Sequence, residues 1–383
     1  MRPAGRAATK SSRCSSSEVD TRIEAAGQTG RRAPAPDMDR VEVVAPNLKR
    51  RLSGVTSTII QLVPLQAEML GIATLGPGLP DSLPRMRWWQ VFALLKRPAS
   101  GRKRIWHARR NTEMVAGLVL KTLFRAPLKL VFTSAAQRDH RPFTKWLIRR
   151  MDAVIATSAR SGGFLDVPHT VIMHGVDLEE FHPPRSGGDA FSASALPGKY
   201  AVGCFGRVRH QKGTDLFVDS MIELLPHYPD WTAVIAGRVT AEQKAFGDEL
   251  ESRVAKAGLS DRVVFLGEVP DIKPWYRRVS LYVAPSRNEG FGLTPLEAMA
   301  SQTAVVASDA GAYAEMIVPG VTGSVVAAGD GDALTEAIRP YLADPALAEA
   351  HGVNALAHVT EHFPLQREAA AIRTIYDQVW AQG

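Results

Sequence analysis

The sequence predicts an α/β protein made of two doubly wound domains, each with a parallel sheet between helices. From Met38 onward, short runs of β-branched and small apolar residues alternate with helical patterns. This alternation stops once, over 179–199, where Pro, Gly and Ser predict a connection between domains. The length of 383 residues also fits two domains. Ligands of open parallel sheets bind beyond the carboxyl ends of the strands, so the site is expected between the domains.

The expected domains cover residues 38–181 and 182–362, and a C-terminal helix over 363–383 is expected to pack back toward the first domain. Each domain repeats the alternation of strand and helix. In the first half, strands are predicted at 41–46, 104–110, 128–134 and 152–158, with helices at 53–69, 114–124 and 143–151 and a basic amphipathic segment at 85–97. In the second half, buried strands are predicted at 200–206, 231–237, 262–268, 281–286, 303–309 and 323–327.

Residues 1–37 are rich in Ser, Arg, Ala and Pro and nearly free of large apolar side chains, so this extension is expected to be disordered. The Arg and Ser content would also fit an organelle transit peptide, but Glu18, Asp20 and Glu24 argue against it. Ordered sequence begins directly after Met38, which is the expected start of the native chain.

Basic charge is concentrated in the first half. Residues 38–181 hold 22 Lys and Arg against 11 Asp and Glu, whereas residues 182–383 hold 17 against 24. This excess predicts an anionic partner, either nucleic acid or the phosphates of a membrane surface. No run approaches the about 18 apolar residues that a membrane span needs, and the N-terminus lacks a secretory apolar core, so a cytoplasmic protein is expected. Cys14 and Cys204 have no metal-ligand spacing.

The stretch RNEGFGLTPLEAMA places two glutamates, Glu289 and Glu297, around a glycine turn that leads into a helix. One interpretation is structural: Thr294 would be the helix N-cap and Glu297 would complete a capping box. That interpretation leaves Glu289 and the turn unexplained. Gly290 and Gly292 let the backbone approach a ligand closely, and the helix N-terminus favours an anion, which predicts a ligand with phosphates and hydroxyls.

A second motif, FGRVRHQKG, follows a predicted strand and places Arg207 and Lys212 beside glycines at its carboxyl end. Loop cations are usually just solvated. At a strand end these two would instead neutralise a diphosphate without a metal.

The two motifs together, with VIMHGVDLEEFHP before them, resemble the retaining glycosyltransferases of family 4, which have the GT-B fold of two Rossmann-like domains facing a cleft. The resemblance implies that Arg207 and Lys212 hold the diphosphate of a nucleotide-sugar donor and stabilise the leaving group. It implies that Glu297 binds the ribose, that Glu289 binds the donor sugar, and that the loop around Val269 meets the base. The main chain of the turn would line the sugar and phosphate at Gly290, Phe291, Gly292 and Leu293.

Further positions follow from the same resemblance. His107 matches the histidine that faces the donor sugar, and Gly54 matches the glycine-rich first loop at the phosphates. His174 stands where many relatives have Asn and is left unassigned. Asp330-Gly331-Asp332 looks like a metal-binding motif but is expected to be a helix start. Neither a metal nor a cofactor is expected, because two cations would neutralise the diphosphate and the donor itself is a substrate. The resemblance also implies retention by a front-face path, in which the leaving phosphate helps remove the acceptor's proton.

The first half resembles bacterial lipopolysaccharide core mannosyltransferases in LKRRLSGVTSTI, IWHARRN and VFTSAAQRDHRPFTKWLIRRMDAVIATS. This implies transfer of mannose from GDP-mannose to the Kdo of a lipid-linked, anionic inner-core acceptor. Trp88, Trp89 and Phe92 among cations predict either a surface helix whose aromatic rings enter the core or contact with the inner face of the cytoplasmic membrane. Two alternatives stay open: a family 4 transferase using a UDP-sugar on another envelope or exopolysaccharide acceptor, and a nucleic-acid-binding α/β protein. The acidic second half and the lack of a reading motif argue against nucleic acid.

Overall fold

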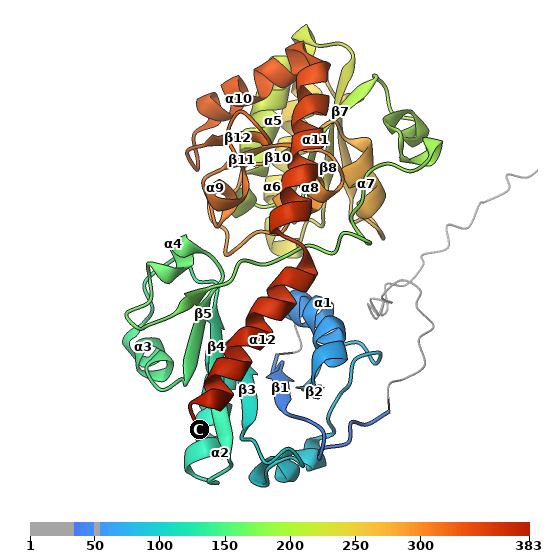
Figure 1. The fold of residues 1–383 in the computed structure, drawn as a ribbon. Coiled ribbons are helices and arrows are strands. Elements are labelled where there is room, and N and C mark those ends of the chain that lie inside the picture. Colours follow the sequence, from blue (N-terminus) through green and yellow to red (C-terminus); the bar gives the residue numbers. More distant parts are fainter. Residues whose placement is uncertain (1–33, 50–53) are drawn as a thin grey trace, which may run out of the picture.

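The computed structural model describes residues 34–49 and 54–383, and it contains two α/β domains joined by two crossings of the chain (Figure 1). The expected disorder of 1–37 falls almost wholly outside these residues, as do Cys14 and the basic residues at 50–52. The predicted fold class is confirmed, because each domain is built on its own six-stranded parallel sheet.

The sheet of the first domain has the strand order β2-β1-β3-β4-β5-β6, and every pairing in it is parallel. Its strands are β1 (Val43–Pro46), β2 (Ile72–Leu75), β3 (Arg104–Ala108), β4 (Leu128–Ser134), β5 (Ala153–Ala156) and β6 (Thr170–Val171). The chain moves to one side of β1 to form β2 and then to the other side to form β3. The order therefore reverses between β1 and β3, and such a reversal opens a crevice at the carboxyl ends of the strands.

Two layers of helices cover this sheet, because successive strand residues point to opposite faces. Val43 packs in a core with α1 and the C-terminal helix α12 (Leu365–Ala381), whereas Val44 packs in a core with η1 and α2. The helices of the domain are α1 (Gly54–Met69), α2 (Asn111–Thr122), α3 (Pro142–Ile148), α4 (Ala159–Gly162) and the 3-10 helix η1 (Trp88–Leu95). The expected amphipathic segment at 85–97 thus folds as a 3-10 helix, and Arg104 fixes its end by donating to the carbonyl of Ala93.

The sheet of the second domain has the order β12-β11-β10-β7-β8-β9 and is also parallel. Its strands are β7 (Tyr200–Phe205), β8 (Trp231–Ala236), β9 (Val263–Gly267), β10 (Leu281–Ala284), β11 (Ala304–Ser308) and β12 (Gly323–Val326). Here the order reverses between β7 and β10. The two sequence motifs follow these two strands, so the topology brings them together.

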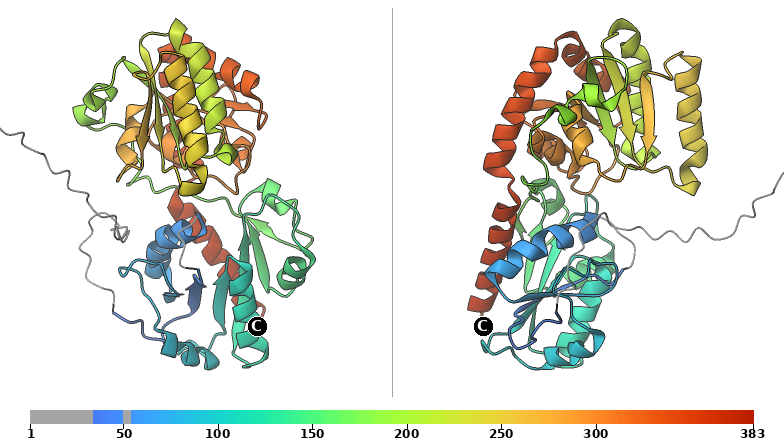
Figure 2. Two further views of the ribbon diagram at one scale, coloured as in Figure 1. Left: turned by 180° about the vertical axis from the view of Figure 1, so that it is seen from behind. Right: turned by 90° about the vertical axis from the view of Figure 1, so that its right-hand side faces the viewer.

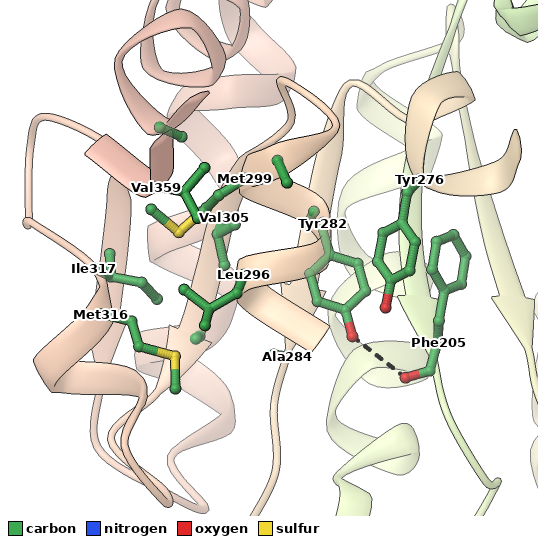
Figure 3. Packing of buried hydrophobic residues seen from close by; sticks show 14 of the residues in the cluster. Phe205, Tyr276, Tyr282, Ala284, Leu296, Met299, Val305, Met316, Ile317 and Val359 are labelled. Atoms are coloured by element: carbon green, nitrogen blue, oxygen red, sulfur yellow. Dashed lines mark hydrogen bonds between the residues drawn. The ribbon is translucent and has the colours of Figure 1, made fainter. Parts of the chain in front are cut away.

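Helices cover both faces of this second sheet as well (Figure 2). They are α5 (Thr214–Leu224), α6 (Lys244–Lys256), α7 (Lys273–Arg278), α8 (Thr294–Ala300), α9 (Tyr313–Met316), α10 (Gly331–Ala343) and α11 (Pro345–His362). Asp330 caps α10 by accepting a hydrogen bond from the Ala333 amide at 2.9 Å, which confirms the expected helix start. In one core, Phe205, Tyr276 and Tyr282 stack edge to face, and both tyrosine hydroxyls point to the same side (Figure 3).

Residues 179–199 pack against the second domain. Phe181 and Phe191 enter its core, and Asp189 at the end of η2 (Gly187–Asp189) accepts a hydrogen bond from Arg277 at 2.6 Å. The backbone amide of Arg185, with the Arg277 guanidinium, holds the pKa of Asp189 well below its ordinary value. This stretch is therefore ordered by side-chain contacts in spite of its Pro, Gly and Ser content.

The second crossing runs from α11 into α12 (Leu365–Ala381), and it pairs with the first. Val176 donates its amide to the carbonyl of Phe363 at 2.9 Å and accepts from the amide of Leu365 at 3.1 Å. Beyond the crossing, α12 lies along the first domain beside α1 (Figure 1), and Trp380 donates to the carbonyl of Lys103 at 2.8 Å. The first domain is consequently completed by the last residues of the chain.

Candidate active site

A cavity of about 490 Å³ lies between the two domains, where the crevices of their sheets face each other. The first domain contributes the start of α1 after β1 and loops after β3, β4 and β5, and the second contributes loops after β7 and β10. The lining residues are Gly54, Ser57, Thr58, Gln61, Arg109, Thr133, Ala135, Thr157, His174, Lys212, Glu289, Gly290, Phe291, Gly292, Leu293, Thr294 and Glu297.

An ion pair between Lys212 and Glu289 joins the loops that follow β7 and β10. Burial opposes the charge of Lys212, but Tyr313 and Glu289 outweigh it, so the pKa of Lys212 is raised above its ordinary value. The next residue, Gly213, has a φ of 70°, and a Cβ there would lie 1.9 Å from the carbonyl oxygen of Pro285. Only glycine fits this close approach, which holds Lys212 beside the β10 loop.

Arg207, the second residue after β7, lines a narrow pocket that Lys212 also lines. Among the described residues, no hydrogen bond or ion pair engages the Arg207 guanidinium. A half-buried guanidinium without a protein partner retains its five donors for a ligand. The two cations of the second motif are thus neighbours, and Lys212 is bound to one of the two glutamates of the first motif.

Glu297 lines the cavity and accepts a hydrogen bond from the hydroxyl of Tyr276 at 2.7 Å. Burial raises the pKa of Glu297, while the Tyr276 hydroxyl and the Lys212 charge pull it down. The capping-box interpretation is wrong: Leu293 is the N-cap of α8 and the cap has no side-chain hydrogen bond. The hydrogen bond from Tyr276 fixes the position of the Glu297 carboxylate at the cavity wall.

The glycine turn between the glutamates brings backbone to the cavity wall. Gly292 has a φ of 88°, and a Cβ on it would lie 2.3 Å from a ring carbon of Tyr313, so no larger residue fits. A Cβ on Gly290 would lie 3.4 Å from the carbonyl oxygen of Ala135 in the first domain. The turn is therefore where the domains come close.

His107, which we expected to face the donor sugar, is buried and is not among the residues that line the cavity. The side chain is fully buried in β3, with Nδ1 2.6 Å from the Tyr376 hydroxyl and Nε2 2.7 Å from Oγ1 of Thr133. Burial, with the nearby Arg109 charge, lowers the pKa of His107 well below its ordinary value. Thr133 and Arg109 line the cavity in its place. His107 lies behind them because β3 continues through it and ends one residue later.

Arg109 and His174 are cavity residues that we did not predict. Arg109 follows β3, and its guanidinium donates to the His107 carbonyl at 3.3 Å. His174 lies at the first crossing, and its Nδ1 is 2.7 Å from the Glu368 carboxylate of α12. The sequence contained a signal for Arg109, because it is a cation two residues after His107, which the family resemblance had singled out. The partnership of His174 with Glu368 had no local signal, because 194 positions separate the two.

Of the last two predicted site residues, Gly54 lines the cavity and Val269 does not. Gly54 opens α1 at the cavity, and a Cβ there would meet nothing within 4 Å. Val269 follows β9, the edge strand of the second sheet, and packs against its core rather than lining the cavity. Across residues 34–49 and 54–383, no cluster of His, Cys, Asp and Glu has the makings of a metal site, and no helix is long and apolar enough to cross a membrane.

Two neighbouring cations, Arg207 and Lys212, beside two carboxylates suit a ligand that combines a diphosphate with hydroxyl-rich sugars. A cavity of this kind, shared by two Rossmann-like domains, fits a nucleotide-sugar-dependent glycosyltransferase of the GT-B fold.

Comparisons with known proteins also indicate a glycosyltransferase. A model of the family "Glycosyl transferases group 1" matches residues 199–344. The lipopolysaccharide core biosynthesis mannosyltransferase LpcC of Rhizobium leguminosarum bv. viciae is 68% identical over 345 residues, which cover 90% of this chain and 98% of that protein. The mannosyltransferase LpsB of Rhizobium meliloti (strain 1021), of the same described role, is 54% identical over 348 residues, or 90% and 99% of the two chains. The structure of Anabaena HepE in complex with UDP and glucose superposes with a TM-score of 0.72 at 19% identity, over 88% of this chain and all of that one.

The chain therefore belongs to the group 1 glycosyltransferases, family 4, and its relatives in that family include the two lipopolysaccharide core mannosyltransferases. The resemblance inferred from the two motifs is confirmed.

Proposed function

We propose that this glycosyltransferase moves mannose from GDP-mannose onto the Kdo of an inner-core lipopolysaccharide precursor, with retention of anomeric configuration. The observation that carries the reaction class is the meeting of Lys212 and Glu289, beside Arg207, in one cavity between the domains. The choice of mannose and of the lipopolysaccharide core is supported by the names of two relatives that are 68% and 54% identical over nearly their whole length.

Lys212 and Arg207 would bind the donor diphosphate and stabilise its charge as the bond to the sugar breaks. Lys212 is ion-paired with Glu289 and carries a raised pKa, which keeps it charged at neutral pH. Arg207 has no protein partner among the described residues, so its donors need not leave another group to reach a phosphate. Two fixed positive charges would let a diphosphate depart without a metal ion.

The carboxylates would hold the two sugars of the donor. Glu297, kept in place by Tyr276, would accept hydrogen bonds from the ribose hydroxyls. Glu289 would bind hydroxyls of the mannose and stabilise positive charge that develops at its anomeric carbon. The main chain from Gly290 to Leu293 would line the sugar and phosphate, and Gly54 would leave room for the acceptor and phosphate from the first domain. The loop at Val269 would meet the base.

Arg109 and His174 are the first-domain residues that we add to this site, and both line the cavity opposite the cationic loop. Arg109 would attract an anionic acceptor such as the carboxylate of Kdo. Because Glu368 takes the Nδ1 side of His174, the Nε2 side remains for a ligand hydroxyl or phosphate. His107 would act indirectly, by holding Thr133 at the cavity wall.

Transfer would take place at the inner face of the cytoplasmic membrane, because the acceptor is a lipid and the donor is a nucleotide. No nucleic acid is involved in this proposal. The excess of basic residues in 38–181 would serve the anionic acceptor and the lipid surface around it.

A direct test is to incubate the protein with GDP-mannose and a Kdo-bearing lipid A precursor and to measure the mass of the product. We expect the gain of one hexose, no gain with a precursor that lacks Kdo, and a gain slowed by at least about 100-fold with Lys212→Met protein. Thermal unfolding with GDP, UDP and ADP side by side identifies the donor base, because the cognate nucleotide binds the native state most tightly and raises Tm most. Stabilisation by UDP alone, or transfer without Kdo, would overturn the proposed donor or acceptor.

A further inference from the structure

Exposed aromatic side chains are confined to one part of the molecule. Six Trp and Phe residues among those described are exposed by 46 to 74%, and all of them belong to the first domain: Trp88, Trp89, Phe92, Phe124, Phe143 and Trp146. The large apolar residues exposed on the second domain are valines only. Scattered exposed apolar residues need no explanation, but a gathering of aromatic rings marks an interaction surface.

The three elements that carry these rings form a single layer. Trp88, Trp89 and Phe92 lie on η1, Phe124 follows α2, and the other two lie on α3. The inner sides of η1, α2 and α3 pack in the same core, on the face of the sheet that α12 does not cover (Figure 2). We call this outer side of η1, α2 and α3 the aromatic face. The interpretation in which the η1 rings enter the core is wrong for these three, because only Gln90 and Leu94 of η1 are buried.

The segments around these elements are basic. Residues 85–150 contain 17 Lys and Arg against two acidic residues, Glu113 and Asp139. Only one Lys each belongs to α2 and α3, and Arg104 and Lys129 are buried, so the exposed cations lie mainly in the flanking loops. Exposed cations flank the rings, and the Arg150 guanidinium stacks over Trp146 at 3.7 Å from the ring centroid. Aromatic rings with cations around them are the composition of a surface that inserts rings at the headgroup level of an anionic bilayer.

We propose that the aromatic face docks this enzyme on a bilayer of anionic phospholipid, with η1 inserting its rings between headgroups and the exposed cations that flank its elements contacting phosphates, among them Arg87, Lys96 and Arg125. Residues 182–383 have a net negative charge, so the anionic bilayer would repel the second domain. The molecule would therefore bind with its first domain toward the membrane. The choice of a lipid partner rests in part on the lipid-linked acceptor of the proposed function. The placement of the rings is independent of it.

The test is flotation of the full chain with vesicles, which requires neither donor nor acceptor. Vesicles of phosphatidylcholine alone are compared with vesicles containing phosphatidylglycerol, each at low and high salt. We expect binding to the anionic vesicles only, weakened by salt because the basic contacts are screened. The combined variant Trp88→Ser, Trp89→Ser, Phe92→Ser should bind at least tenfold more weakly. The control Val318→Ser, Val321→Ser removes exposed apolar residues of the second domain and should bind like the wild type.

A second variant, Phe143→Ser with Trp146→Ser, tests α3 separately, and unfolding temperatures verify that each variant is folded. The proposal is wrong if the wild type binds neither vesicle, if it binds both equally, or if the folded ring variants bind unchanged. It is also wrong if sedimentation reveals a dimer that the η1 variant dissociates while vesicles are not bound, because a second copy would then cover the face. Loss of flotation with intact hexose transfer to a detergent-solubilised acceptor would leave the proposed function standing.

Discussion

Replacing Lys212 by Met removes the cation that we place at the donor diphosphate while keeping an unbranched side chain of similar length. In the wild type, the ammonium contacts the Glu289 carboxylate and both lie partly buried between the domains. The variant therefore loses the charge opposite the phosphates. It also leaves a carboxylate in the cavity that would repel them.

The size of the effect follows from this burial. Two unit charges about 4 Å apart interact by about 4 kcal/mol at the effective dielectric constant near 20 of partly buried pairs. Part of this holds the donor in its ground state, and the part gained only as the leaving group develops charge resembles the loss of one transition-state contact, about 100-fold to 1,000-fold in rate. We expect kcat/KM for GDP-mannose to fall by at least about 100-fold.

The assay is hexose transfer to the lipid acceptor, with Tm measured for each protein. Lys199→Met is the matched control, because Lys199 pairs with Asp230 at 2.9 Å on the exposed surface and should leave transfer unchanged. A transfer rate of Lys212→Met within about fivefold of the wild-type rate would refute the reasoning, because the loss of a contact to the leaving group should lower the rate much more than that.

Three further outcomes are expected. In Tyr276→Phe, Glu297 loses a hydrogen bond that lowers its pKa, so its pKa rises further and the loss of donor affinity on acidification, measured by nucleotide titration, begins at a higher pH than in the wild type. Glu368→Gln weakens the hydrogen bond to His174. We expect kcat to fall about tenfold, which corresponds to the loss of one charge-assisted hydrogen bond, with Tm little changed. A large fall in Tm with normal kcat would show that the pair has only a structural role. Burial raises the pKa of Cys204 to about 12, so this thiol should stay unlabelled by a thiolate-specific reagent at pH 8 until the protein is unfolded, as peptide mass spectrometry would verify.

The sequence by itself determined the fold class, because strand and helix periodicities are local and parallel sheets follow from their alternation. It also determined which loops carry the proposed donor site. Arg207 and Lys212 follow one predicted strand and Glu289 follows another, and the carboxyl ends of parallel strands meet at one edge of the sheet whatever the details of packing.

Only the tertiary structure decided which side chains of those loops face the cavity. A strand's length fixes the direction of each residue, and because β3 runs through His107, it is Arg109 that reaches the cavity. From the sequence, Glu297 could equally have completed a helix cap. In the structure its carboxylate instead accepts a hydrogen bond from Tyr276, which belongs to a different helix. Such contacts join residues that are distant in sequence, so they depend on how separate elements pack against one another, which no local pattern of residues specifies.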